Sequence, residues 1–146
     1  MAFKFKFATL MNVRKIQENI ALQAFSQAQR YLNTLMAMKE QVKARRDILR
    51  AELMTRMKGG IRSTEVKGYY DYLSHLEKGI ERIDENIKAA EKQLGEKREA
   101  LMKAKRGFKA ITRLREIHLA RHEEAERKKD MKFLDEIAVL RHGGAR

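Results

Sequence analysis

Residues 66–111, VKGYYDYLSHLEKGIERIDENIKAAEKQLGEKREALMKAKRGFKAI, carry the strongest structural signal in the chain. Steps of three and four residues along this stretch reach an apolar side chain almost every time. These positions are Val66, Tyr69, Leu73, Leu76, Ile80, Ile83, Ile87, Ala90, Leu94, Leu101, Ala104, Phe108 and Ile111. Lys97 interrupts the series once. So long a repeat of about 3.5 residues is what a coiled coil requires, and it predicts one helix that buries a narrow apolar stripe against another.

The first half of the chain carries a looser repeat with the same spacing. Its positions are Ala28, Tyr31, Leu35, Met38, Val42, Arg45 and Leu49, preceded by Leu10, Val13, Ile16, Ile20 and Ala24. An additional step of four residues between residues 20 and 28 predicts a stutter, which locally unwinds a supercoil. We expect this repeat to face the second helix.

A glycine-containing segment, MKGGIRSTE at residues 57–65, separates the two halves. Gly59 or Gly60 can take the left-handed conformation that ends a helix, Ser63 is a good N-cap, and Glu65 favours the positive end of the next helix dipole. So short a loop makes two long helices antiparallel neighbours. The expected fold is all-α, an antiparallel coiled-coil hairpin in one domain, with helices at about 8–57 and 64–140, a turn at 58–63 and a flexible tail at 141–146.

Hairpin geometry places residue i opposite a residue near 122 − i, so Leu10 lies opposite residue 112. The apolar repeat of the second helix stops at Ile111, which lies opposite the N-terminal start of the first helix. The next positions of the repeat are polar: Arg115, His118 and His122. The second helix is therefore expected to overhang, and its overhang carries a new apolar stripe of Phe133, Leu134, Ile137 and Leu140, which is typical of a binding face.

Composition excludes several classes of function. The chain has no cysteine and no proline, and it carries a net charge of +13. No phosphate-binding loop, zinc-protease motif or glycine-flanked serine nucleophile is present, and a two-helix hairpin offers no enclosed pocket, so neither catalysis nor a cofactor is expected. No signal peptide or membrane-spanning stretch is recognisable, which favours a cytoplasmic protein. His118 and His122 have the spacing of a metal site, but without a third ligand we interpret them as the polar end of the repeat.

Basic side chains are concentrated at the expected open end of the hairpin. Residues 101–122 hold Lys103, Lys105, Arg106, Lys109, Arg113, Arg115 and Arg121 against the single acid Glu116, and residues 1–17 add Lys4, Lys6, Arg14 and Lys15. An anionic partner is indicated, which could be nucleic acid, anionic lipid or an acidic protein surface. Nucleic-acid binding needs such a patch, but no aromatic stacking platform accompanies it. Near the turn, Tyr70 and Tyr72 point away from the repeat and are candidate anchors for a partner.

Three segments stand out beside the repeat: Phe3-x-Phe5-x-Phe7-x-x-Leu10 with Arg14, the Gly59-Gly60-Ile61 turn followed by Tyr69-Tyr-Asp-Tyr-Leu-Ser-His-Leu-Glu-Lys-Gly-Ile80, and Lys132-Phe-Leu-Asp-Glu-Ile-Ala138. They resemble segments of the FliJ family of flagellar export proteins. These matches fall partly outside the heptad repeat, which makes them more specific than coiled-coil similarity alone.

The resemblance implies a cytoplasmic stalk of the flagellar type III export apparatus, similar to the central stalk of rotary ATPases and attached to the membrane only through its partners. Its open end would enter the hexameric export ATPase FliI, through Phe3, Phe5, Phe7, Arg14, Lys109, Arg113, Arg115, Phe133, Leu134, Asp135, Glu136 and Ile137. It also implies contacts with export chaperones and with the export gate protein FlhA, the latter through Met38, Val42, Leu49, Tyr72, Leu76 and Ile83. Two alternatives stay open: a basic coiled coil that binds nucleic acid, and the equivalent stalk of a virulence secretion system.

Overall fold

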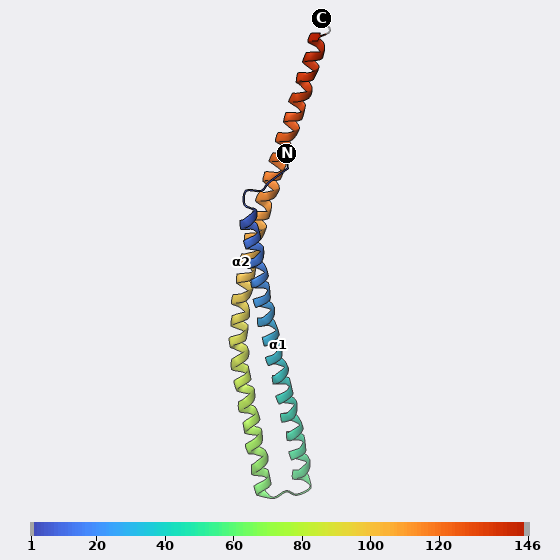
Figure 1. Cartoon of the computed structure of the whole chain (residues 1–146). Coiled ribbons are helices and arrows are strands. Elements are labelled where there is room, and N and C mark those ends of the chain that lie inside the picture. Colours follow the sequence, from blue (N-terminus) through green and yellow to red (C-terminus); the bar gives the residue numbers. More distant parts are fainter. Residues whose placement is uncertain (1, 145–146) are drawn as a thin grey trace. The chain divides into compact units, whose positions relative to one another are not determined.

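The computed structural model describes residues 2–144 and contains two long α-helices packed against each other (Figure 1). Helix α1 spans Ala8–Lys58 and helix α2 spans Ser63–Gly144. The expected all-α hairpin with a longer second helix is confirmed. Where the sequence predicted a flexible tail from residue 141, α2 remains helical as far as Gly144, and residues 145 and 146 lie outside the described part of the chain.

The chain divides into two compact units, and each unit contains residues of both helices. Residues Ala21–Leu101 form the first, which contains the turn between the helices and is called the hairpin unit below. Residues 2–20 and 102–144 form the second, the terminal unit, in which the start of α1 packs on the later part of α2. The sequence alone pointed to a single domain.

The turn depends on a glycine and on the backbone of Arg62. Gly60 has a φ of 85°, a left-handed conformation that a residue with a Cβ adopts only with strain. The carbonyl of Arg62 accepts hydrogen bonds from the N–H groups of Glu65 and Val66, at 3.0 and 3.1 Å. Arg62 therefore occupies the capping position at the start of α2, whereas Ser63, which the sequence suggested for that role, is the first helical residue.

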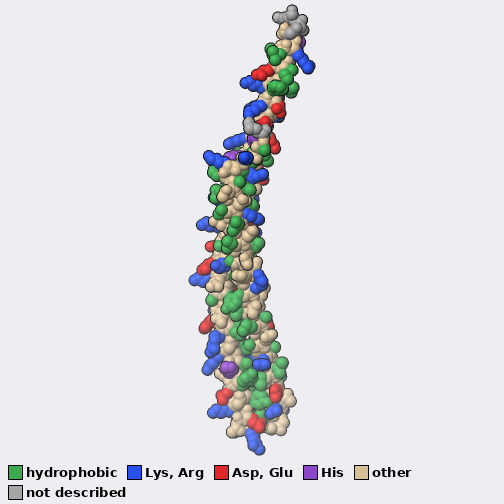
Figure 2. Space-filling view, viewed as in Figure 1, with side chains coloured by type: hydrophobic (Ala, Val, Ile, Leu, Met, Phe, Trp, Pro, Cys, Tyr) green, Lys and Arg blue, Asp and Glu red, His purple; other side chains and the backbone are tan. Residues whose placement is uncertain are grey.

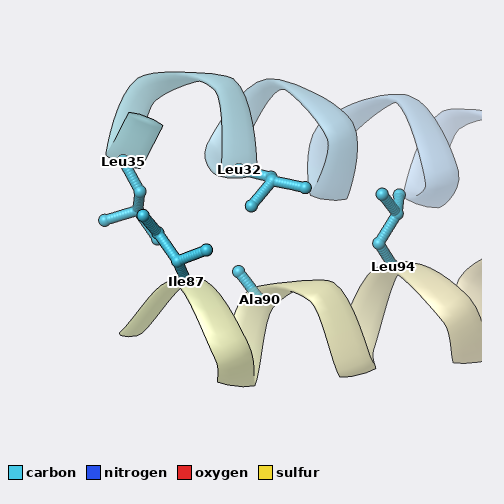
Figure 3. Close-up of a cluster of buried hydrophobic side chains, with 5 residues drawn as sticks. All are labelled: Leu32, Leu35, Ile87, Ala90 and Leu94. Carbon is cyan, nitrogen blue, oxygen red and sulfur yellow. The ribbon is translucent and has the colours of Figure 1, made fainter. Parts of the chain in front are cut away.

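The core of the hairpin unit is a single row of apolar side chains between the two helices. Leu32 and Leu35 of α1 meet Ile87, Ala90 and Leu94 of α2, and all five are buried (Figure 3). The buried residues of α2 in this unit all belong to the predicted repeat: Leu73, Leu76, Ile80, Ile87, Ala90, Leu94 and Leu101. The stripe on α2 was therefore correctly predicted.

On α1 the predicted repeat is wrong by one residue at every second position. Leu32 is 5% exposed, whereas the neighbouring Tyr31, which was expected to face α2, is 53% exposed. The same shift of one residue recurs further along α1, where Lys39 and Arg46 are half-buried and the predicted Met38 and Arg45 are exposed. The Nζ atom of Lys39 lies 2.6 Å from an Asp84 carboxylate oxygen of α2. Long basic side chains can bury their methylene groups and keep the charge near water, so they occupy positions that an apolar pattern assigns to their neighbours.

In the terminal unit none of the positions predicted for the α1 repeat is the one that faces α2. The residues of α1 that are partly buried are Met11, Arg14 and Glu18, whereas Leu10, Val13, Ile16 and Ile20 are 40–62% exposed. Arg14 donates a hydrogen bond from Nη1 to the carbonyl of Gly107, at 3.0 Å. Steps of three and four residues connect Met11 to Glu18 and continue at Ala21 and Phe25, all partly buried. The repeat that faces α2 therefore continues without the stutter predicted between residues 20 and 28.

Candidate partner-binding site

The residues before α1, residues 2–7, lie along α2 and are called the aromatic clip here; residues 2–5 have no regular secondary structure, and residues 6–7 form a turn that leads into α1. Phe5 and Phe7 pack against the imidazole ring of His118, with ring centroids 5.6 and 6.3 Å apart. Phe3 packs against His122 at 5.5 Å. The polar positions that follow Ile111 in the α2 repeat are thus covered by phenylalanine rings, and the two histidines are packing partners within the terminal unit.

Cations surround the clip. The guanidinium carbon of Arg115 lies 5.8 Å from the Phe3 ring centroid, and the Lys6 ammonium lies 5.8 Å from that of Phe7. The Lys15 ammonium lies 4.9 Å from the ring centroid of Phe108 on α2. Such cation–π contacts each contribute roughly 0.5–1 kcal/mol at exposed sites. Phe3, Phe5, Phe7, Arg14 and Arg115, which the family resemblance assigned to partner binding, thus hold the start of the chain against α2.

Most of the net charge of the chain lies in this unit. Residues 2–20 and 102–122 carry eleven Lys and Arg side chains against two glutamates, which gives +9 of the total +13 with histidine neutral. Lys109 and Arg113, two of the predicted ATPase contacts, are exposed. An anionic surface approaching the terminal unit is therefore attracted by a dense positive field.

Beyond Phe3, α2 continues as the overhang, residues 123–144, without α1 beside it (Figure 1). Phe133 is 63% exposed and Leu134 is 62% exposed, and Leu140 is exposed further along. Ile137 is half-buried among them, and the acidic Asp135 and Glu136 lie on the same turn. Large apolar side chains concentrated on one unpaired helix make the overhang a candidate contact surface for a protein.

The predicted gate surface divides into core and surface residues. Leu76 is buried and Ile83 packs against the buried cluster, so these two stabilise the hairpin. Tyr72 and Met38 are exposed. A shallow hollow of about 390 Å³ is lined by Leu49, Arg56, Glu65, Gly68, Tyr69 and Tyr72. A second of about 350 Å³ is lined by Gln41, Val42, Arg45 and Leu76.

The first hollow holds a hydrogen-bonded tyrosine. The hydroxyl of Tyr69 donates to a carboxylate oxygen of Glu52 at 3.0 Å, and the Arg56 guanidinium lies 5.8 Å from the Tyr69 ring centroid. Beside it, the ring of Tyr72 stacks on His75 with 6.4 Å between centroids. Sequence reasoning missed Glu52 and Arg56, although the pairing of residue i with 122 − i places Glu52 opposite residue 70.

We expect the Tyr69 hydroxyl to ionise above the ordinary tyrosine pKa of 10.0. Partial burial raises its pKa from the ordinary 10.0, and the hydrogen bond to Glu52 raises it further. Because the folded state holds this proton more tightly, the stabilisation is present below the unfolded-state pKa and is lost as pH rises through the folded-state pKa. The chain has no tryptophan, so tyrosinate absorbance reports the titration directly. Tyr69→Phe should remove a component of the tyrosinate titration whose midpoint lies above 10.0, and removal of a component with its midpoint at or below 10.0 would contradict the assignment.

Residues 2–144 contain neither a metal-binding cluster nor a membrane-spanning helix. Within them, no group of three or more His, Asp or Glu side chains is arranged to hold a metal ion. None of the described helices has a stretch long and apolar enough to cross a lipid bilayer.

Comparison with known proteins identifies the family. The family model described as flagellar FliJ protein matches residues 3–146. The flagellar FliJ protein of Bacillus subtilis (strain 168) is 19% identical over 139 residues, which are 95% of this chain and 95% of the relative. No solved structure matches the chain. Since the family model covers nearly the whole sequence, the chain belongs to the FliJ family of flagellar export proteins.

Proposed function

We propose that this chain is a non-catalytic stalk and coupling protein of the flagellar type III export apparatus. Its terminal unit enters the hexameric export ATPase FliI, and its hairpin unit contacts the export gate protein FlhA and export chaperones. Through these partners it resides in the cytoplasm at the export machinery of the inner membrane. The observation that carries the proposal is the overhang of α2, which in a member of this family exposes Phe133 and Leu134 without a partner helix.

The terminal unit has the chemistry of a segment held inside a protein ring. Its positive charge attracts acidic surfaces from a distance, and exposed apolar side chains then supply the buried contact area that gives affinity. Phe133 and Leu134 are the anchors of this contact, flanked by Asp135 and Glu136 on the same turn. Lys109 and Arg113 add charge complementarity on the earlier part of α2.

The hairpin unit offers a different kind of contact. Tyr72 lines the hollow beside Leu49, and Val42 lines the second hollow beside Leu76. An exposed aromatic ring next to a half-buried leucine is a suitable receptor for an apolar side chain of the gate protein. Leu76 and Ile83 contribute by fixing the spacing of the two helices under this surface.

The absence of cysteine from the chain allows a two-partner cross-linking map. Leu134→Cys and Tyr72→Cys, each carrying a photo-activated cross-linker, are mixed with the purified ATPase and with the purified gate domain. Residue 134 should cross-link to the ATPase and residue 72 to the gate protein. Ile48→Cys, an exposed position of the hairpin unit outside both surfaces, serves as the control. Cross-linking of residue 134 no stronger than that of residue 48 would contradict the proposed orientation.

A further inference from the structure

The exposed aliphatic residues at the start of α1 belong to none of the partner surfaces described above. Leu10, Val13, Ile16 and Ile20, called the aliphatic stripe here, are 40–62% exposed. At about 100° per residue, Val13, Ile16 and Ile20 lie within an arc of roughly 60° that points well away from the inward positions Met11, Arg14 and Glu18. Four large aliphatic side chains recurring on one helix in contact with water need a physical explanation beyond ordinary surface composition.

The stripe belongs to a strongly cationic part of the chain. The stripe lies within residues 2–20, which pack on residues 102–122, and these two segments together carry +9. Lys4, Lys6 and Lys103 are exposed. Arg106 and Arg113 are exposed too, but at about 100° per residue they lie on the face of α2 turned away from α1 and do not border the stripe. Figure 2 shows Lys and Arg side chains at both margins of this part of the molecule, with hydrophobic side chains between them.

An aliphatic stripe on a helix together with dispersed lysines and arginines is the pattern of a surface that lies on anionic lipid. The apolar side chains enter the boundary between headgroups and acyl chains, while each nearby cation gains from the negative surface potential. Nucleic acid would also attract the cations, but its recognition uses stacking on aromatic or guanidinium groups rather than exposed isoleucine and valine. The cations are spread over two segments instead of being gathered in one pocket, which suits an extended surface of many headgroups.

We propose that the terminal unit binds anionic phospholipid directly, with the aliphatic stripe inserted among the headgroups and the surrounding Lys and Arg side chains paired with phosphates. The chain would then reach the membrane in two ways, through its protein partners and by binding lipid itself. The inserted residues, Leu10, Val13, Ile16 and Ile20, are none of those assigned to the ATPase contact or to the gate hollows. A failure of the lipid proposal therefore leaves the stalk proposal intact, and the converse also holds.

The absence of tryptophan makes a direct test possible. Full-length Ile16→Trp and Ile48→Trp each carry a single tryptophan, one in the stripe and one at an exposed position of the hairpin unit. With vesicles of phosphatidylcholine and phosphatidylglycerol, emission of Ile16→Trp should shift to shorter wavelength and that of Ile48→Trp should stay unchanged. Vesicles of phosphatidylcholine alone should shift neither, and added salt should reverse the shift because it screens the cations.

A flotation assay with the same vesicles separates insertion from simple electrostatic adsorption. Ile16→Gln with Ile20→Gln should weaken partitioning to anionic vesicles by about tenfold or more, because two aliphatic side chains leave the membrane. Ile48→Gln with Met54→Gln, a matched pair of exposed positions, should leave partitioning unchanged. Equal partitioning of both pairs, no emission shift at residue 16, or a shift with duplex DNA but not with vesicles would each overturn the proposal.

Discussion

Leu32→Ala is expected to lower the free energy of unfolding by about 2–4 kcal/mol, whereas Tyr31→Ala should cost less than about 1 kcal/mol. Leu32 is 5% exposed and packs in the central cluster, so its truncation removes buried area and leaves a cavity between two helices that cannot easily close. Tyr31 is 53% exposed and loses little burial. Urea denaturation followed by circular dichroism measures both changes.

This adjacent pair of residues tests the register of α1, because a shift of one residue exchanges their roles. Leu35→Ala serves as a positive control, since position 35 faces α2 in either register. A larger loss of stability for Tyr31→Ala than for Leu32→Ala would show that α1 packs as its apolar pattern alone predicts.

Phe133→Ser combined with Leu134→Ser is expected to reduce stimulation of the export ATPase by at least about tenfold when the concentration of the chain is below saturation. Each side chain is more than 60% exposed, and central apolar anchors commonly contribute about 2 kcal/mol or more to a protein interface. ATP hydrolysis by the purified ATPase, titrated with wild-type or variant chain, measures the effect.

The matched control is Ile48→Ser with Met54→Ser, which changes two equally exposed apolar residues in the hairpin unit. Its stimulation should equal that of the wild type. Because all four positions are exposed, circular dichroism should report an intact helical fold for both double variants. If the control pair lowered stimulation as much as the overhang pair, binding would not depend specifically on the overhang.

The sequence predicted α2 well because its inward positions are almost all aliphatic. Leu73, Leu94 and Ile111 are buried where the repeat places them. The sequence failed on α1 because two registers one residue apart share Ala28 and Leu35, and the apolar pattern favours the wrong one. The correct register accepts Lys39 and Arg46 at inward positions, and a pattern search based on hydrophobicity cannot credit the buried methylene groups of charged side chains.

The aromatic clip was missed although its signal is present in the sequence. Residues 3–7 alternate phenylalanine and lysine, which is the period of an extended segment with one apolar face. The pairing rule places Phe5 opposite residue 117, next to His118, whose ring it contacts. His118 was instead interpreted as a polar end of the repeat, because polar residues at inward positions do not by themselves reveal a cover supplied by a different segment. The partner-binding roles proposed for residues 133–137 and for the gate surface rest on family resemblance, since the sequence pattern does not give the identity of a partner.

The proposed stalk role predicts a change in the rate of ATP hydrolysis by the purified export ATPase when the purified full-length chain is added. A stalk held in the ring favours its assembled state, so we expect the rate to rise severalfold and to saturate as the chain is added, with both proteins eluting together from a sizing column. An unchanged rate without co-elution would contradict the account.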